Sequence, residues 1–168
     1  MASIDDLKAK LSGGGARPNL FRVTLNFPAY AGGDSELASF LTKSATIPPS
    51  VLGVIEVPFR GRKLKIPGDR TFETWNITVI NDLGYKLRNA FMAWSNGINA
   101  NADNTGTSVP NDYMTDLLVE QLDSNENVVK SYKIVGSWPS NIGEIELNNE
   151  TNDTIEEFTV EFQYQYWV

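Results

Sequence analysis

Apolar and polar residues alternate without a break near the C-terminal end of the chain. The apolar positions are Phe158, Val160, Phe162, Tyr164 and Tyr166. The polar positions between them are Thr159, Glu161, Gln163 and Gln165. Because successive side chains of a strand point to opposite faces, this pattern predicts a long strand with one apolar face and one hydrated face.

The same alternation predicts strands at residues 21–27 and 75–79. Residues 54–66 are typical of a hairpin whose turn lies near Arg60, Gly61 and Arg62, and Pro58 favours an edge position for it. Two more strands are predicted at about 115–122 and 128–135, joined by a turn at 123–127. The count is seven or eight strands.

One stretch has the spacing of an amphipathic helix, at about residues 83–96, with Asn81 or Asp82 as its N-cap. Its apolar stripe consists of Leu83, Leu87, Ala90, Phe91 and Trp94. Many strands with one principal helix predict a mainly β protein, an antiparallel sandwich or barrel. Residues 97–112 are rich in Asn, Asp, Gly, Thr and Ser and predict a long polar loop.

The first residues differ from the rest. Ile4, Leu7 and Leu11 have helical spacing, and three glycines at 13–15 follow them. We expect residues 1–15 to form an arm with a glycine hinge, able to lie against a neighbouring subunit, and residues 16–168 to form one β-domain. The start lacks the basic and apolar segments of a signal peptide, and no apolar run is long enough to span a bilayer.

Composition argues against catalysis. The chain has no cysteine and no histidine, so it lacks the commonest nucleophile–base pairs and the commonest ligands of transition metals. The turn at 123–127 begins like a calcium loop, but Val128 and Ile134 occupy positions that need Gly and Glu. We expect no enzymatic activity, no metal and no cofactor. The net charge of −7 argues against tight binding of nucleic acid over the whole surface.

Basic residues cluster in the predicted hairpin and just after it. They are Arg60, Arg62, Lys63, Lys65 and Arg70. Three interpretations are open: charge that protects an edge strand from wrong pairing, contact with an acidic surface of another subunit or ring, and binding of nucleic acid.

Three segments resemble one protein family, in the family's order. Residues 57–82 resemble the middle of the tail tube proteins of T4-like phages with contractile tails, residues 16–23 their opening segment, and residues 136–145 their late loop. The aromatic-rich strand at the C-terminal end also resembles the end of the chain in this family. The resemblance also favours a strand within 37–46 that pairs with the first strand. More distant relatives of this family form the inner tubes of type VI secretion systems and tailocins.

The resemblance implies a structural protein of the virion tail, assembled in the host cytoplasm. It implies hexameric rings with a continuous inner β-barrel, which stack into a hollow tube that conducts DNA. The implied partners are further copies of the chain, the tail sheath, the baseplate and the tail terminator, with only transient, non-specific passage of DNA and no membrane. The alternative from another class is a monomeric β-sandwich that binds a ligand or carbohydrate.

Two groups of residues are candidates for these roles. The polar face of the last strand, Thr159, Glu161, Gln163 and Gln165, is the candidate for the lumen. The hairpin residues Arg60, Arg62, Lys63 and Lys65 are the candidates for contacts between rings.

Overall fold

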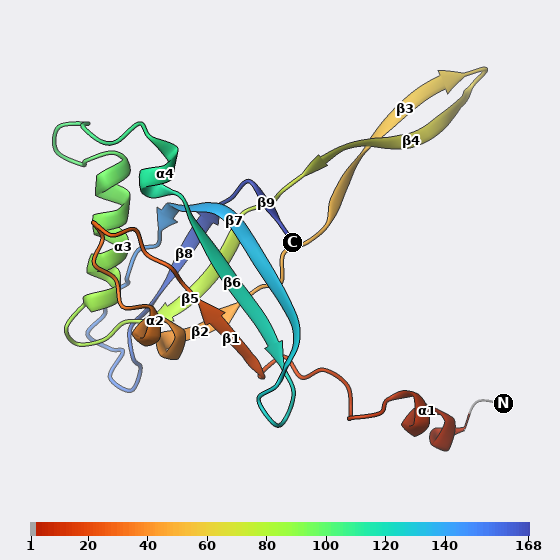
Figure 1. Cartoon of the computed structure of the whole chain (residues 1–168), viewed down its shortest axis with the longest axis horizontal. Coiled ribbons are helices and arrows are strands. Elements are labelled where there is room, and N and C mark those ends of the chain that lie inside the picture. Colours follow the sequence, from red (N-terminus) through yellow and green to blue (C-terminus); the bar gives the residue numbers. More distant parts are fainter. Residues whose placement is uncertain (1–2) are drawn as a thin grey trace.

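The body of the protein is one curved antiparallel sheet, seen in a computed structural model that describes residues 3–168 (Figure 1). The strand order is β1-β6-β7-β8-β5-β2, and β9 pairs with β7. The bounds are β1 (Phe21–Thr24), β2 (Thr42–Ala45), β5 (Trp75–Ile80), β6 (Thr115–Leu122), β7 (Val128–Ile142), β8 (Glu157–Gln163) and β9 (Tyr166–Trp167). The predicted mainly β, antiparallel class is confirmed.

The remaining elements lie around or outside this sheet. They are the hairpin β3 (Val51–Phe59) and β4 (Arg62–Thr71), and the helices α1 (Ile4–Lys10), α2 (Ser35–Leu41), α3 (Lys86–Ile98) and α4 (Pro110–Tyr113). The hairpin and the N-terminal segment with α1 project from the body in two directions (Figure 1). No helix among residues 3–168 is long and apolar enough to cross a membrane.

The principal helix, α3, covers one face of the sheet with the predicted stripe. Leu87, Ala90, Phe91 and Trp94 are all buried. The predicted start was wrong, because α3 begins at Lys86 and Leu83 is 99% exposed. A turn precedes the helix: the Tyr85 amide donates to the Asp82 carbonyl, and Tyr85 adopts a left-handed conformation with φ 54°.

We expect Phe91→Ala to lower the free energy of unfolding by about 3–5 kcal/mol, because it leaves a cavity among aromatic rings. The Phe91 ring lies 5.1 Å from Phe27 and 6.1 Å from both Phe158 and Phe162, centroid to centroid. Leu83→Ala is the control and should cost less than about 0.5 kcal/mol. Urea denaturation of the unassembled subunit measures both; equal losses would contradict this core.

The segment 37–46 is only partly the predicted strand. Residues Ser35–Leu41 form α2, because the Asp34 carboxylate accepts hydrogen bonds from the amides of Glu36 and Leu37 and so caps a helix. The strand that follows, β2, pairs with β5 and not with the first strand. The pairing favoured by the resemblance is therefore wrong.

The predicted late loop at 136–145 is largely strand. β7 continues to Ile142, pairing first with β6 and then with β8. Gly136, with φ 66°, and a register shift near Pro139 let one strand pass between the two partners. The shift also provides a place where the missing amide of proline is tolerated.

The last strand is shorter than its alternation predicted. β8 ends at Gln163, and the chain bends at Tyr164 and Gln165 before β9 pairs with β7. Phe158, Val160, Phe162 and Tyr164 are buried as predicted. Tyr166 is 48% exposed, so its predicted place on the apolar face was wrong.

The N-terminal arm carries the predicted helical spacing. In α1 and at its C-cap, Ile4, Leu7 and Leu11 are all exposed. Ser3 and Asp6 form a capping box that starts the helix. Residues 1–2 of the predicted arm lie outside the described residues.

Candidate lumen face and assembly hairpin

Four neighbouring strands, β2, β5, β8 and the end of β7, present a polar face, which we name the wall face. Its polar residues are Ser44, Asn76, Thr78, Asn141, Thr159, Glu161 and Gln163. Trp138, which pairs with Gln163, and Ile80 and Glu157, which pair with each other, lie on the same side. The register places Thr78 beside Ser44 and Thr159, and Glu161 beside Asn76 and Asn141. Three of the four predicted lumen residues are therefore brought together on one surface.

The wall face is hydrated because the opposite face of the same strands is packed. Trp75, Ile77 and Val79 of β5 alternate with the wall residues and are buried, as are Phe158, Val160 and Phe162 of β8. Trp94 of α3 lies 5.9 Å from the Phe162 ring, centroid to centroid. The helix thus fixes which side of the sheet remains open.

The electrostatics of the wall face are nearly neutral. Glu161 is the one charged side chain of the seven, and the Asn141 amide nitrogen lies 3.5 Å from its carboxylate. At the edge of the face, the Lys43 ammonium is paired with the Glu157 carboxylate at 2.7 Å. A face with few free cations has little attraction for phosphate.

Gln165 lies apart from the other predicted lumen residues. It follows the end of β8, its amide donates to the Val135 carbonyl, and its side chain lies against Gly136. The sequence alone gives no signal for this bend, because the alternation continues through it.

The hairpin β3–β4 confirms the predicted strand–turn–strand unit. Arg60 and Gly61 form its two-residue turn, both with positive φ, 47° and 77°. This is the geometry of a type I′ turn, in which glycine at the second position is favoured. The four predicted assembly residues all lie at or near the distal end.

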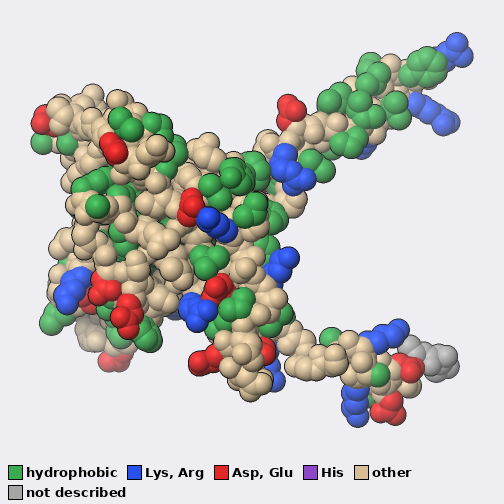
Figure 2. Space-filling model, viewed as in Figure 1, with side chains coloured by type: hydrophobic (Ala, Val, Ile, Leu, Met, Phe, Trp, Pro, Cys, Tyr) green, Lys and Arg blue, Asp and Glu red, His purple; other side chains and the backbone are tan. Residues whose placement is uncertain are grey.

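The hairpin carries an exposed apolar surface besides its charges (Figure 2). Its exposed apolar side chains are Leu52, Val54, Ile55, Val57, Phe59, Leu64 and Ile66. An isolated two-stranded hairpin is only marginally stable, and large exposed apolar patches mark interaction surfaces. The sequence pattern showed these residues but not that the body leaves them uncovered.

Some basic residues of the hairpin have a partner within the hairpin, and others do not. The Lys63 ammonium pairs with the Glu56 carboxylate at 2.6 Å, and the Arg60 guanidinium lies 5.2 Å from the Phe59 ring centroid. Among the described residues, Arg60, Arg62 and Lys65 have no ion pair within 4 Å, and Arg60 and Arg62 lie nearest the tip of the hairpin. Five basic and two acidic residues give segment 51–71 a net charge of +3. Arg60 and Arg62 are thus the charges best placed to contact a partner.

The turn at 123–127 has a structural role in the fold. The Asp123 carboxylate accepts hydrogen bonds from the amides of Asn127 and Asn125, which lower its pKa. Within residues 3–168, no group of three or more acidic residues is arranged to hold a metal ion.

Comparison with known sequences identifies the family. The family model described as phage tail tube protein matches residues 16–168. The tail tube protein of Serratia phage KSP90 is 34% identical over 168 residues, which cover 98% of this chain and 95% of that protein. The tail tube protein gp19 of Enterobacteria phage T4 is 33% identical, with 98% of each chain covered.

Solved structures share the fold. A sheath/tube terminator of the extracellular contractile injection system PVC has a TM-score of 0.68 at 13% identity, covering 92% of this chain and 95% of that one. A chain of the PVC sheath–tube complex has a TM-score of 0.64 at 14% identity, covering 100% and 97%. These relatives do not support a monomeric module that binds ligand or carbohydrate. With its three segments in order, its fold and these relatives, the chain belongs to the phage tail tube protein family.

Proposed function

We propose that this chain closes into hexameric rings, that the rings stack head to tail into a hollow tube, and that DNA passes through it during ejection. The main support for this proposal is the wall face. Four adjacent strands with one packed face and one polar face are what a subunit needs to contribute a section of a water-filled barrel.

Ring closure would also remove a liability of the isolated subunit. The sheet ends at β1 on one side and at β2 on the other, so each of these two strands has one edge that no strand of this chain pairs with. Unpaired edges are prone to wrong association, and a repeated head-to-tail contact that closes gives a ring without free edges. The continuous inner β-barrel of the ring follows from this step.

The charge of the wall face suits the transit of DNA. Non-specific binding of DNA comes from Lys and Arg that neutralise phosphates. A cationic lumen would repeat such contacts at every ring and hold the DNA in place. The wall face has Glu161, and the Lys43 ammonium at its edge is already paired with Glu157, so the face gives the DNA little to bind.

The hairpin is our candidate for the contact between rings, through Arg60, Arg62, Lys63 and Lys65. Its exposed apolar side chains favour a protein contact over simple edge protection or binding of nucleic acid. We assign residues 1–15 to an arm that lies against a neighbouring subunit and residues 16–168 to the tube domain.

The wider assembly follows from the family. Similar folds occur in a sheath–tube complex, a baseplate and a tube terminator of contractile systems. We infer the same three classes of partner, a place in the virion tail and assembly in the host cytoplasm. We expect no enzymatic turnover.

Polymerisation tests the proposal. The purified chain, at high concentration and with a matching baseplate as seed, should form unbranched tubes of constant diameter. Analytical ultracentrifugation and negative-stain imaging detect them. A chain that stays monomeric even with the baseplate would contradict the tube and revive the monomeric alternative.

A further inference from the structure

We infer that a groove formed by segment 143–157 receives the tip of the β3–β4 hairpin from a second copy of this chain. The inference rests on the proposed tube, because it names the surface that would meet the hairpin. We call this surface the receiving groove.

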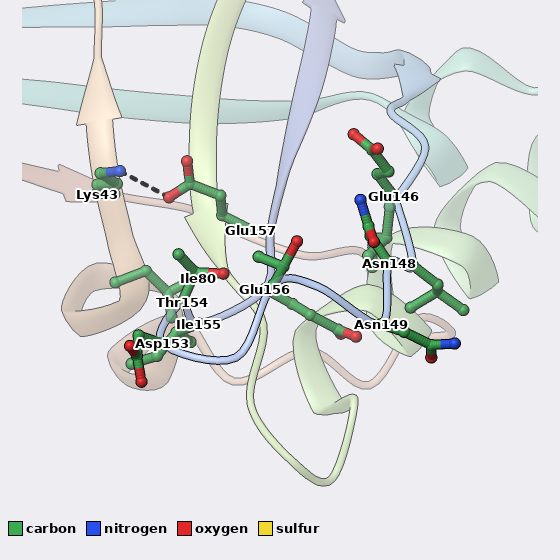
Figure 3. Close-up of a pocket in the computed structure, with 13 residues that line it drawn as sticks. Lys43, Ile80, Glu146, Asn148, Asn149, Asp153, Thr154, Ile155, Glu156 and Glu157 are labelled. Carbon is green, nitrogen blue, oxygen red and sulfur yellow. Dashed lines mark hydrogen bonds and ion pairs between the residues drawn. The ribbon is translucent and has the colours of Figure 1, made fainter.

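The receiving groove is an open cavity of about 890 Å³. The segment between β7 and β8 forms most of it, with Lys43 of β2 and Ile80 of β5. Figure 3 shows Glu146 and Asn149 on one side of the view and Asp153 and Thr154 on the other, with Glu156 between them. A cavity of this size can hold several side chains.

Charge complementarity is the first argument for the occupant. Segment 143–157 contains six acidic residues and no basic residue. Four acidic side chains line the groove, Glu146, Asp153, Glu156 and Glu157, against the single cation Lys43. The hairpin has a net charge of +3, the opposite sign to the chain as a whole. The α1 arm, with two acidic and two basic residues, lacks this match.

Apolar surface is the second argument. Leu147 and Ile155 line the groove and are 79% and 74% exposed, and Ile80 and Ile145 line it as well. The hairpin tip presents Phe59 and Leu64, which are 67% and 62% exposed. Each surface therefore combines uncovered apolar side chains with charge, and the charges have opposite signs.

The positions of the two surfaces are the third argument. The hairpin leaves the body at one end, whereas the 143–157 segment lies at the opposite end, beside the start of β8 (Figure 1). A head-to-tail repeat uses two different surfaces of each copy, and successive copies continue in one direction. A projection at one end and a groove at the other meet this requirement.

Hydrogen bonds anchor the two ends of the segment that forms the groove. At one end of the segment, Arg88 donates to the Gly143 carbonyl at 2.9 Å, and the Gly143 amide donates to Thr159 at 2.6 Å. At the other end, Asn81 and Tyr85 both donate to the Glu156 carboxylate at 3.0 Å. The Tyr85 hydrogen bond and the nearby Glu156 charge raise the pKa of the Tyr85 hydroxyl. Anchored ends restrict the segment and so reduce the cost of ordering it on binding.

Disulfide trapping tests the inference, because the natural chain has no cysteine. Arg62→Cys in the hairpin is combined in turn with Asn149→Cys, Asp153→Cys or Thr154→Cys in the groove. A disulfide needs Cα atoms within about 7 Å. Tubes assembled under reduction and then oxidised should give, for at least one pair, a ladder of covalent oligomers extending beyond six chains.

Controls separate this contact from random oxidation. Mixing two single-cysteine proteins, one with Arg62→Cys and one with the matching groove cysteine, should stop the reaction at dimers. Arg62→Cys with Asn125→Cys, in the exposed β6–β7 turn, should give no ladder. Tubes without any groove ladder, or equal ladders from the Asn125 control, would overturn the receiving groove and leave the tube intact. Absence of tubes from the natural chain would instead overturn the proposed function.

Discussion

Replacing Arg60 and Arg62 by Glu should leave a folded subunit that closes rings but no longer stacks them. Each charge contact between partly exposed groups contributes only about 0.2–1 kcal/mol. The contact repeats at every subunit of a ring junction, however, and reversal converts attraction into repulsion. We chose these two arginines because Lys63 is already paired with Glu56 in the hairpin. The backbone strain at Arg60 should not increase, since Glu and Arg have similar access to positive φ.

Electron microscopy would count tubes against isolated rings, and circular dichroism would check the fold. Arg17→Glu with Lys130→Glu is the matched control, because both side chains are exposed and lie outside the hairpin. The control should form tubes of normal length. Residual stacking in the hairpin variant should depend strongly on salt, since screening weakens repulsion. Normal tubes from the hairpin variant would reduce the basic cluster to edge protection.

Replacing Glu161 and Gln163 by Lys should leave the tube intact and slow DNA ejection by about tenfold or more. Both side chains lie on the hydrated side of β8, so the core under them is unchanged. Two added cations per subunit recur around each ring and along every ring of the tube. Because DNA binding through phosphates weakens steeply with salt, ejection should recover as the salt concentration rises.

Phage that carry the lysine variant would be triggered to eject in a series of salt concentrations, with released DNA followed by fluorescence. Glu161→Gln, which removes the charge without adding a cation, should eject at the normal rate. Tail length is measured first by imaging. Normal ejection from the lysine variant at low salt would mean that the wall face points away from the lumen.

Much of the fold was predictable because the spacing of apolar residues along the chain matches their burial in the core. The apolar residues that alternate along β5 and β8 form one side of the core, and those at helical spacing in α3 form the other. The local pattern and the tertiary contacts therefore agree in these three elements. The hairpin was predictable for a different reason, because a glycine, Gly61, lies between two extended runs and marks a turn there.

The errors occurred where a tertiary contact overrides a local pattern. Leu83 fits the helical stripe, but the turn at 82–85 leaves it in solvent. Tyr166 continues the alternation, but a bend moves it onto a different partner strand. Residues 136–142 contain glycine and proline and therefore resemble a loop, yet bulges keep them in the sheet.

Only part of the candidate surfaces could be predicted. Thr159, Glu161 and Gln163 of the wall face could be predicted, because the alternation along one strand places all three on the same side. The receiving groove was not, since it joins β2, β5 and a segment more than sixty residues further along the chain, and its acidic residues alone are typical of any solvated loop. The pairing of Lys63 with Glu56 likewise depends on hairpin register.

A cryo-electron microscopy reconstruction of the polymer tests the central claim most directly. We predict stacked six-fold rings in which the polar face of β2, β5, β8 and the end of β7 lines an open channel, with Thr159 and Glu161 pointing into it. A polymer without six-fold rings, or one in which this face lies on the outside of the tube, would contradict the account.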